Sequence, residues 1–212
     1  MDFSTNQVVD IIFRLAVLLF SVVIHEVSHG AVAYALGDNT AKDAGRLTLN
    51  PIPHIDLLGS IIMPLFIGFG WAKPVPYNPN NLSNRRWGPL MVGVAGPLSN
   101  ILVAVFFGLF VRFRNVEILT NLDGNFFVIA QGIVILNLGL AIFNLIPIPP
   151  LDGSKVLFAF LPRTSIDFEI FLERYGMLML LFIIILMPGL LLNLILPAAQ
   201  FLFGLITGGL LL

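Results

Sequence analysis

The stretch "SVVIHEVSHGAVAYAL" (residues 21–36) decides the fold, because it places two imidazoles and a carboxylate inside an otherwise apolar run. It closes an apolar block that extends from Val8 to Leu36, and a membrane-spanning helix needs only about 20 such residues. An uncompensated charge at the centre of a bilayer costs about 2.5–3.5 kcal/mol on insertion scales, so ionisable side chains within a span indicate a functional site.

The composition of the 212-residue chain indicates an integral membrane protein. Hydrophobic residues make up 58% of the chain and charged residues 11%, whereas an average soluble domain contains about 25% charged residues. The absence of cysteine excludes disulfides, thiolate metal sites and cysteine nucleophiles. A formal net charge of −1 gives no basic surface for nucleic acid. Residues 1–10 contain no basic segment, so we expect the first helix to remain as a span rather than to be removed as a signal peptide.

The apolar blocks predict an all-α polytopic membrane protein with about four to six transmembrane helices, in one domain over residues 1–212. Besides the first block, we expect spans at 90–111 and 126–146, and C-terminal hydrophobic helices over about 175–207 that divide at "MPG" (187–189). The segment 57–71 is apolar but short and contains Gly and Pro, so we expect a broken helix or a re-entrant piece there.

His25, Glu26 and His29 form the pattern H-E-x-x-H. Positions i and i+4 share one face of a helix, so both imidazoles can direct a nitrogen at the same metal ion. Glu26 lies next to the first ligand and can take a proton from a water that the ion activates. The pattern also occurs by chance in soluble helices, but the apolar surroundings favour a metal site here, with a His/Glu proton relay as the other interpretation.

A catalytic zinc site takes three protein ligands, so a third ligand must come from elsewhere in the chain. The candidates are Asp152 in "NLIPIPPLDG" (144–153), and His54 or Asp56 in a polar loop. Spacing alone does not choose between them. The prolines of the 144–153 stretch favour Asp152, because they prevent a regular helix and stiffen the backbone. Irregular backbone at membrane depth is tolerated where protein buries it or water lines it.

Taken together, the two motifs resemble those of the site-2 protease family of intramembrane zinc metalloproteases, peptidase family M50. "AGPLSN" (95–100) is similar to the Gly-Pro-x-x-Asn signature of the family. "GRLTLNPIPHIDLLGSIIMP" (45–64) and "GWAKPVP" (70–76) resemble the compact subgroup without PDZ or CBS domains. The likeness covers most of residues 20–160.

The resemblance implies a three-helix catalytic core within about residues 8–160, and one zinc ion per chain, held within the membrane and reached by water from the cytosolic side. It implies transmembrane segments of other proteins as substrates. The implied roles are zinc ligand for His25, His29 and Asp152, general base and then proton donor for Glu26, and substrate binding for Asn144.

The sequence leaves several points open. Segment 66–77 could be a short re-entrant β segment that offers an edge strand to an extended peptide, or only a loop below the core. His54 could contact the ligands or be an ordinary loop histidine, and Asn100 could brace the helices or take part in catalysis.

A membrane metal or proton transporter using the same cluster is the alternative function, although one compact ligand set beside a carboxylate suits hydrolysis better. A prokaryotic plasma membrane is the expected location, and the oligomeric state is not determined.

Overall fold

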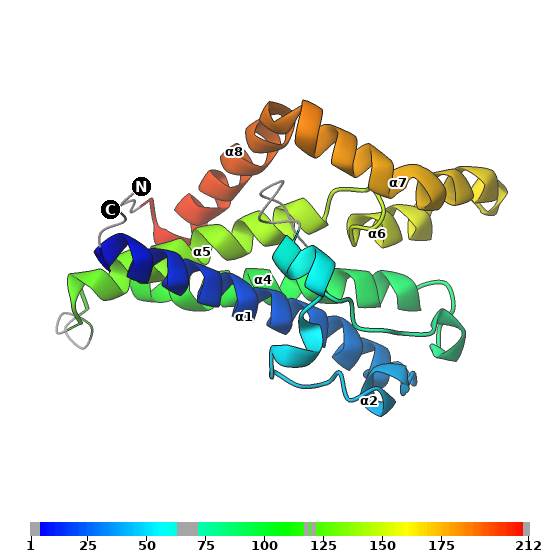
Figure 1. The fold of residues 1–212 in the computed structure, drawn as a ribbon, viewed down its shortest axis with the longest axis horizontal. Coiled ribbons are helices and arrows are strands. Elements are labelled where there is room, and N and C mark those ends of the chain that lie inside the picture. Colours follow the sequence, from blue (N-terminus) through cyan, green and yellow to red (C-terminus); the bar gives the residue numbers. More distant parts are fainter. Residues whose placement is uncertain (1–4, 63–71, 117–118, 120–121, 210–212) are drawn as a thin grey trace.

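The computed structural model describes residues 5–62, 72–116, 119 and 122–209, which form helices joined by loops (Figure 1). The long helices are α1 (Thr5–Ala35), α4 (Gly88–Arg112), α5 (Gly124–Asn144), α7 (Ile166–Leu186) and α8 (Pro188–Thr207). The shorter elements are α2 (Thr40–Asp43), η1 (Ile52–His54), η2 (Leu57–Ile62), η3 (Pro79–Asn81), α6 (Gly153–Phe160) and η4 (Arg163–Ser165). None of the described residues forms a strand. The expected all-α fold is confirmed.

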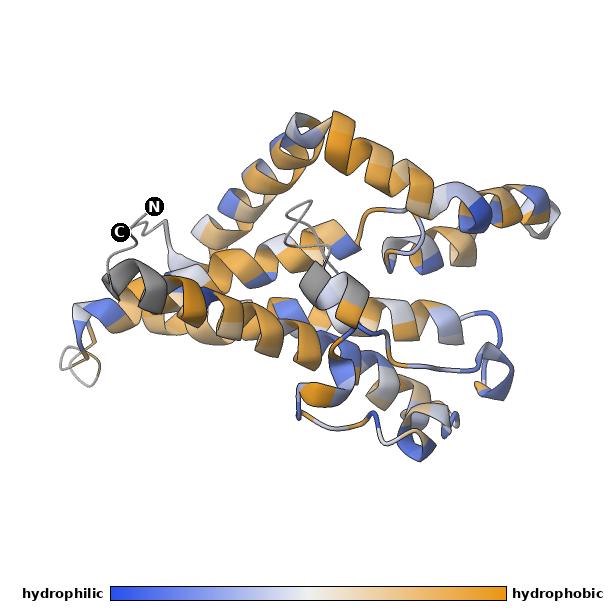
Figure 2. Ribbon diagram, viewed as in Figure 1, coloured by the Kyte–Doolittle hydropathy of each residue, from blue (hydrophilic) through white to orange (hydrophobic). Residues whose placement is uncertain are grey.

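Four of the helices in the described ranges are long and apolar enough to cross a membrane, namely α1 from Ile11, α4, α5 and α8. They correspond to the spans expected at 8–36, 90–111 and 126–146 and to the second part of the C-terminal block. Helix α7 begins at Ile166, before the expected start near 175, because its charged first half continues the same helix. Figure 2 shows this contrast, with hydrophobic colour along the spans and hydrophilic residues near the start of α7. The chain is therefore an integral membrane protein.

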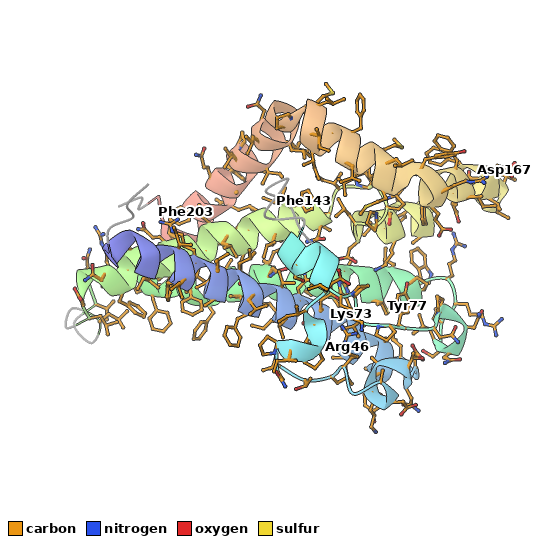
Figure 3. All side chains as sticks on the ribbon, viewed as in Figure 1. Arg46, Lys73, Tyr77, Phe143, Asp167 and Phe203 are labelled. Carbon is orange, nitrogen blue, oxygen red and sulfur yellow. The ribbon has the colours of Figure 1, made fainter. Side chains whose placement is uncertain are left out.

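Helix α4 is the centre of the helical core, because it contacts both α1 and α5, and α8 packs against α4 and α5. The buried core between α4, α5 and α8 contains Ala104, Val134, Leu138, Ala199 and Phe203, of which Phe203 is labelled in Figure 3. At the end of α8, the Arg112 side chain donates a hydrogen bond of 3.0 Å to the carbonyl of Leu205. A donor at this position satisfies a carbonyl that the end of the helix leaves unpaired.

Prolines set the two sharp breaks in the second half of the chain. The proline-containing stretch between α5 and α6 is not helical, as expected, and Gly153 follows it at the start of α6. A side chain at Gly153 would collide with the carbonyl of Leu145, so the turn needs glycine there. Pro188 opens α8 directly after α7 ends, which is the division expected at 187–189.

A polar loop layer follows α1 and ends in the segment Ala72 to Asn78, which has no helix or strand assignment and runs as an extended loop in Figure 1; we call it the strap. Of the expected edge strand 66–77, residues 66–71 lie outside the described residues, and residues 72–77 are extended but pair with no described strand. The first part of the expected broken helix forms the single turn η2, and its remainder, 63–71, also lies outside the described residues.

Asp38 fastens the strap to the end of α1. Its carboxylate accepts hydrogen bonds from the Thr40 hydroxyl (2.6 Å), the Asn78 backbone N–H (2.6 Å) and the Asn81 side chain (2.9 Å). The side chain is fully buried. Burial raises the pKa of the Asp38 carboxyl, but the hydrogen bonds from Thr40, Asn78 and Asn81 outweigh burial and hold its pKa below the usual range.

We expect Asp38→Asn to lower the free energy of unfolding at pH 7 by about 1–3 kcal/mol, because an amide cannot accept all of these hydrogen bonds. A lowered folded-state pKa means that the stabilisation is complete above the unfolded-state value of about 3.9 and is lost as the pH falls through the folded-state value. The difference between wild type and variant should therefore be constant from pH 7 to about 5 and shrink below about 4. Thermal unfolding in detergent measures it. The control is Asp43→Asn, an exposed carboxylate on α2, and equal stability of the two variants would contradict the prediction.

Candidate metal centre

His25 and His29 lie one turn apart on α1, and both direct their Nε2 atoms at one oxygen of Asp152. The distances from Asp152 Oδ2 are 3.0 Å to His25 Nε2 and 3.1 Å to His29 Nε2. The side chains are buried, with exposed fractions of 6% for His25, 7% for His29 and 5% for Asp152. Three potential ligand atoms, one from each residue, lie within 4.8 Å of one another.

The hydrogen bond of His29 fixes the protonation of its ring. Nδ1 of His29 lies 2.6 Å from the carbonyl oxygen of Val92 on α4. A carbonyl can only accept, so Nδ1 carries the hydrogen. The neutral ring then has its lone pair on Nε2, which faces Asp152.

A chain of buried amides fixes the ring of His25 in the same way. Asn137 on α5 donates to the carbonyl of Ile133 (2.9 Å), so its oxygen faces Asn100, which donates to it at 2.9 Å. The Asn100 oxygen is therefore left to accept from His25 Nδ1, at 2.6 Å. Asn100 and Asn137 are completely buried, and Ser21 completes the network by accepting from Asn137 (3.0 Å). His25 Nε2 consequently also carries a lone pair.

Two imidazole lone pairs and a carboxylate oxygen thus converge in a buried space. Acceptors at such distances repel one another unless a proton or a cation lies between them. Two nitrogens and one carboxylate oxygen are a ligand set that Zn²⁺ uses in catalytic sites, with bonds of about 2.0–2.2 Å. In a tetrahedral site such ligand atoms lie roughly 3.4 Å apart, close to the separations of 3.0 and 3.1 Å seen here. The residues therefore fit a zinc ion.

Gly96 lets α4 lie directly against the two imidazoles. A Cβ atom at this position would collide with the Nε2 atoms of both His25 and His29. Glycine is therefore required for α4 to lie this close to the two Nε2 atoms.

The second oxygen of Asp152 is held by a cation. Lys155 Nζ lies 2.8 Å from Asp152 Oδ1, and the Lys155 side chain packs over Gly93 of α4. One oxygen of the carboxylate thus faces the imidazoles while the other is ion-paired, which fixes the orientation of the group.

Glu26 lies beside this cluster but is not part of it. Its Oε2 accepts a hydrogen bond of 2.9 Å from the Val75 backbone N–H in the strap. Glu26 and His25 both line a cavity of about 790 Å³, whose other walls include Pro74 of the strap, Asn144 of α5, Leu180 of α7 and Ile195 of α8. The lining is mostly apolar, so the Glu26 carboxylate and the His25 imidazole are the ionisable groups of an otherwise apolar cavity.

The structure separates the remaining sequence candidates. Asn144 lies on the cavity wall, and its side chain donates to the carbonyl of Leu140 (2.9 Å). His54 is buried, and its Nε2 lies 3.0 Å from the Thr48 carbonyl. Neither His54 nor Asp56 belongs to the ligand cluster found among the described residues. Asn100 braces the helices by hydrogen bonding, one of the two roles left open for it.

Sequence reasoning missed Ser21 and Asn137. The available signal was weak: both are polar residues within apolar blocks, and such residues must find partners at membrane depth. Nothing in their spacing indicates that they meet each other behind His25, because the meeting depends on how α1, α4 and α5 pack.

Comparisons with known proteins agree with this chemistry. The model of peptidase family M50 matches residues 120–187. "Putative zinc metalloprotease YwhC" of Bacillus subtilis is 42% identical over 153 residues, which cover 68% of this chain and 67% of that protein. "Putative zinc metalloprotease Rip2" of Mycolicibacterium smegmatis is 30% identical over 154 residues, covering 69% of this chain and 56% of that protein. A protein of Methanocaldococcus jannaschii that is named a zinc metalloprotease is 29% identical over 150 residues, covering 70% and 34%. No solved structure matches the chain.

We expect Gly96→Ala to abolish zinc binding while the protein remains folded, because the added methyl group would occupy the space between the two imidazoles. Elemental analysis of the purified protein measures the zinc content. Gly132→Ala is the matched control, since a Cβ on Gly132 of α5 would meet nothing within 4 Å. Full zinc occupancy in Gly96→Ala would show that the ion does not bind between these rings.

We expect Asn100→Ala to weaken zinc affinity about 10- to 100-fold, because the His25 ring loses the acceptor that orients it and fixes its hydrogen on Nδ1. Competition with a fluorescent zinc chelator measures the affinity. Asn125→Ala, at the exposed start of α5, is the control and should bind zinc as wild type does. Unchanged affinity in Asn100→Ala would contradict the role assigned to the amide network.

Proposed function

The chain belongs to peptidase family M50, and on that basis we propose that it is an intramembrane zinc metalloendopeptidase. Its reaction would be the hydrolysis of peptide bonds within or near the transmembrane segments of membrane proteins. The observation that supports the proposal most directly is the convergence of three buried acceptor atoms, from His25, His29 and Asp152, beside the carboxylate of Glu26, which lines the same cavity as His25.

In this proposal His25, His29 and Asp152 hold one zinc ion per chain. A bound zinc ion would lower the pKa of water toward 7 and polarise the carbonyl of the scissile bond. The protein provides what the ion requires: two oriented imidazoles, a carboxylate fixed by Lys155, and an open position beside the cavity.

Glu26 is proposed as the general base. Its carboxylate faces the same cavity as His25, so it can take a proton from the attacking water and later give that proton to the leaving amine of the cut peptide. Only Oε2 is engaged by the Val75 N–H, which leaves Oε1 for the proton transfer. A catalytic base held by one of its oxygens keeps its orientation without losing its function.

The cavity suits an apolar peptide segment. Its walls come from α1, α5, α7, α8 and the strap, and they are mainly hydrophobic. A substrate helix must unwind before its carbonyls can react, because its own hydrogen bonds protect them. Asn144 is proposed to hold the unwound backbone from the part of the cavity wall that α5 forms. The strap offers mainly carbonyls along its free edge, since Pro74 and Pro76 have no amide hydrogen, so it can accept from a substrate rather than donate to it.

The proposed setting is a prokaryotic plasma membrane, with the site opening toward the cytosol as the family resemblance implies. A metal or proton transporter is less well supported, because transport requires several weak sites along a path. Among the described residues, a single cluster has metal-ligand geometry, and its three side chains are buried.

Glu26→Gln should retain zinc yet reduce cleavage of a membrane-embedded test substrate by about 10²- to 10⁴-fold, because the amide keeps the shape of the side chain but cannot accept a proton. Cleavage in reconstituted vesicles and elemental analysis of the same sample measure the two properties. Glu173→Gln, on the exposed surface of α7, is the matched control and should cleave as wild type does.

Two results would count against the proposal. Undiminished cleavage by Glu26→Gln would refute the assigned base. Zinc uptake into vesicles by the wild-type protein, without cleavage of any membrane-embedded peptide, would favour the transporter.

A further inference from the structure

The strap is held to the protein by hydrogen bonds at alternate residues. The Lys73 N–H donates to the carbonyl of His54 (2.9 Å), and the Val75 N–H donates to Glu26 (2.9 Å). In an extended chain, alternate residues direct their polar groups to the same side. Lys73 and Val75 therefore bind on one side of the strap, and the intervening residue, Pro74, lines the cavity.

Arg46 holds the same part of the strap from the loop below. Its Nη2 donates a hydrogen bond of 2.7 Å to the carbonyl of Lys73, and Figure 3 shows the two labelled residues next to each other. The Arg46 side chain is buried, with an exposed fraction of 7%, and the described residues provide no carboxylate that pairs with it. Its Nε also has no hydrogen-bond partner within the part of the chain that the structure describes.

A buried, unpaired guanidinium is costly for folding, and an apolar side chain of similar volume would avoid that cost. Stability alone therefore does not account for Arg46. Arg46 does hydrogen-bond the carbonyl of Lys73. Lys73 lies two residues before Val75, whose N–H binds Glu26. The carbonyl of His54 accepts from the backbone N–H of Lys73 and Arg46 donates to the Lys73 carbonyl, so the peptide groups on both sides of Lys73 are held and the direction in which the strap approaches α1 is fixed.

The approach of the strap to α1 is tight. Val75 is 6% exposed, and a Cβ added to Gly30, one turn after Glu26, would lie 2.8 Å from Val75 Cγ1. With the side chain of Val75 seated on Gly30, its N–H has a fixed position over the Glu26 carboxylate. A small shift at Lys73 would move this N–H away from the carboxylate.

We propose that Arg46 is a positioning residue for the general base: by binding the Lys73 carbonyl, it holds the strap so that the Val75 N–H orients the carboxylate of Glu26. The inference rests on the function proposed above. It assigns Arg46 an effect on catalysis without a part in zinc binding, because the three ligands lie on α1 and on the turn before α6, and none of them contacts Arg46 or the strap backbone in the contacts described.

The test compares Arg46→Gln and Arg46→Lys with wild type, and Arg85→Gln serves as the matched control because Arg85 is an exposed loop arginine. Three properties are measured on each full-length protein in vesicles: zinc content, the kcat and KM for a membrane-embedded test peptide, and hydrogen–deuterium exchange of peptides covering 72–78. Exchange reports on the strap with little background, since Pro74 and Pro76 carry no amide hydrogen.

We expect Arg46→Gln to keep its zinc, to lose about 10- to 100-fold in kcat with KM within about threefold of wild type, and to exchange its strap amides at least about tenfold faster. Arg46→Lys retains a donor that can reach the Lys73 carbonyl, so it should recover most of the kcat and of the protection from exchange. Arg85→Gln should match wild type in all three properties.

Three outcomes would overturn the proposal. Unchanged strap exchange in Arg46→Gln would show that Arg46 does not hold the strap. Faster exchange with wild-type kcat would show that the strap does not position Glu26. Loss of zinc together with kcat would show that Arg46 acts through the metal centre or the fold. If wild type cleaves no test peptide, the proposed function fails and takes the catalytic part of this inference with it, while the exchange measurement still decides whether Arg46 holds the strap.

Discussion

Three lone pairs directed at one buried point are the constraint around which this protein is built. The carbonyl of Val92 and the oxygen of Asn100 take the Nδ1 hydrogens of His29 and His25, so both Nε2 atoms face Asp152 as acceptors. No rearrangement of hydrogens within the neutral rings relieves this arrangement, because the partners of Nδ1 can only accept. A shared cation does relieve it. The remainder of the core, in which α4 lies between α1 and α5, brings these partners to the imidazoles.

The proposed ligands and the proposed base are supported by different kinds of structure. His25 and His29 lie on a long helix packed against α4, and Asp152 follows a proline-stiffened turn and is clamped by Lys155. Glu26 also lies on α1, but its carboxylate is oriented by a backbone amide of an extended loop segment. Under the proposed function, metal binding and proton transfer would therefore respond separately to changes in the protein, because one depends on helix packing and the other on a loop.

The sequence was sufficient for the features that depend on local spacing. The i, i+4 relation of His25 and His29, the apolar spans and the proline break before Asp152 follow from residues close together in the chain. Spacing did not distinguish Asp152 from His54; the prolines of the 144–153 stretch favoured Asp152, and the family resemblance implied it as the third ligand. The contacts of Asn100 with Asn137, and of Arg46 with the strap, could not be predicted, because they depend on how distant segments cross. Helix α7 begins at Ile166, before the predicted start near 175, because hydropathy alone does not indicate that its charged first turns continue into the apolar helix.

Buried polar atoms without hydrogen-bond partners indicate which part of this structure opens locally at the lowest cost. Among the described residues, the buried side-chain atoms without a hydrogen-bond partner are Arg46 Nε and His54 Nδ1, and both belong to the loop layer that holds the strap. By contrast, the side-chain amides behind His25 are hydrogen-bonded: Asn100 donates to the carbonyl of Ser21, and Asn137 donates to the carbonyl of Ile133. An unsatisfied buried group costs about 1–3 kcal/mol in the closed state, and part of that cost is recovered when local opening admits water. Local opening is therefore less costly in the loop layer around Arg46 and His54 than among the paired amides around His25, which keeps the three proposed ligands in the more rigid part of the protein.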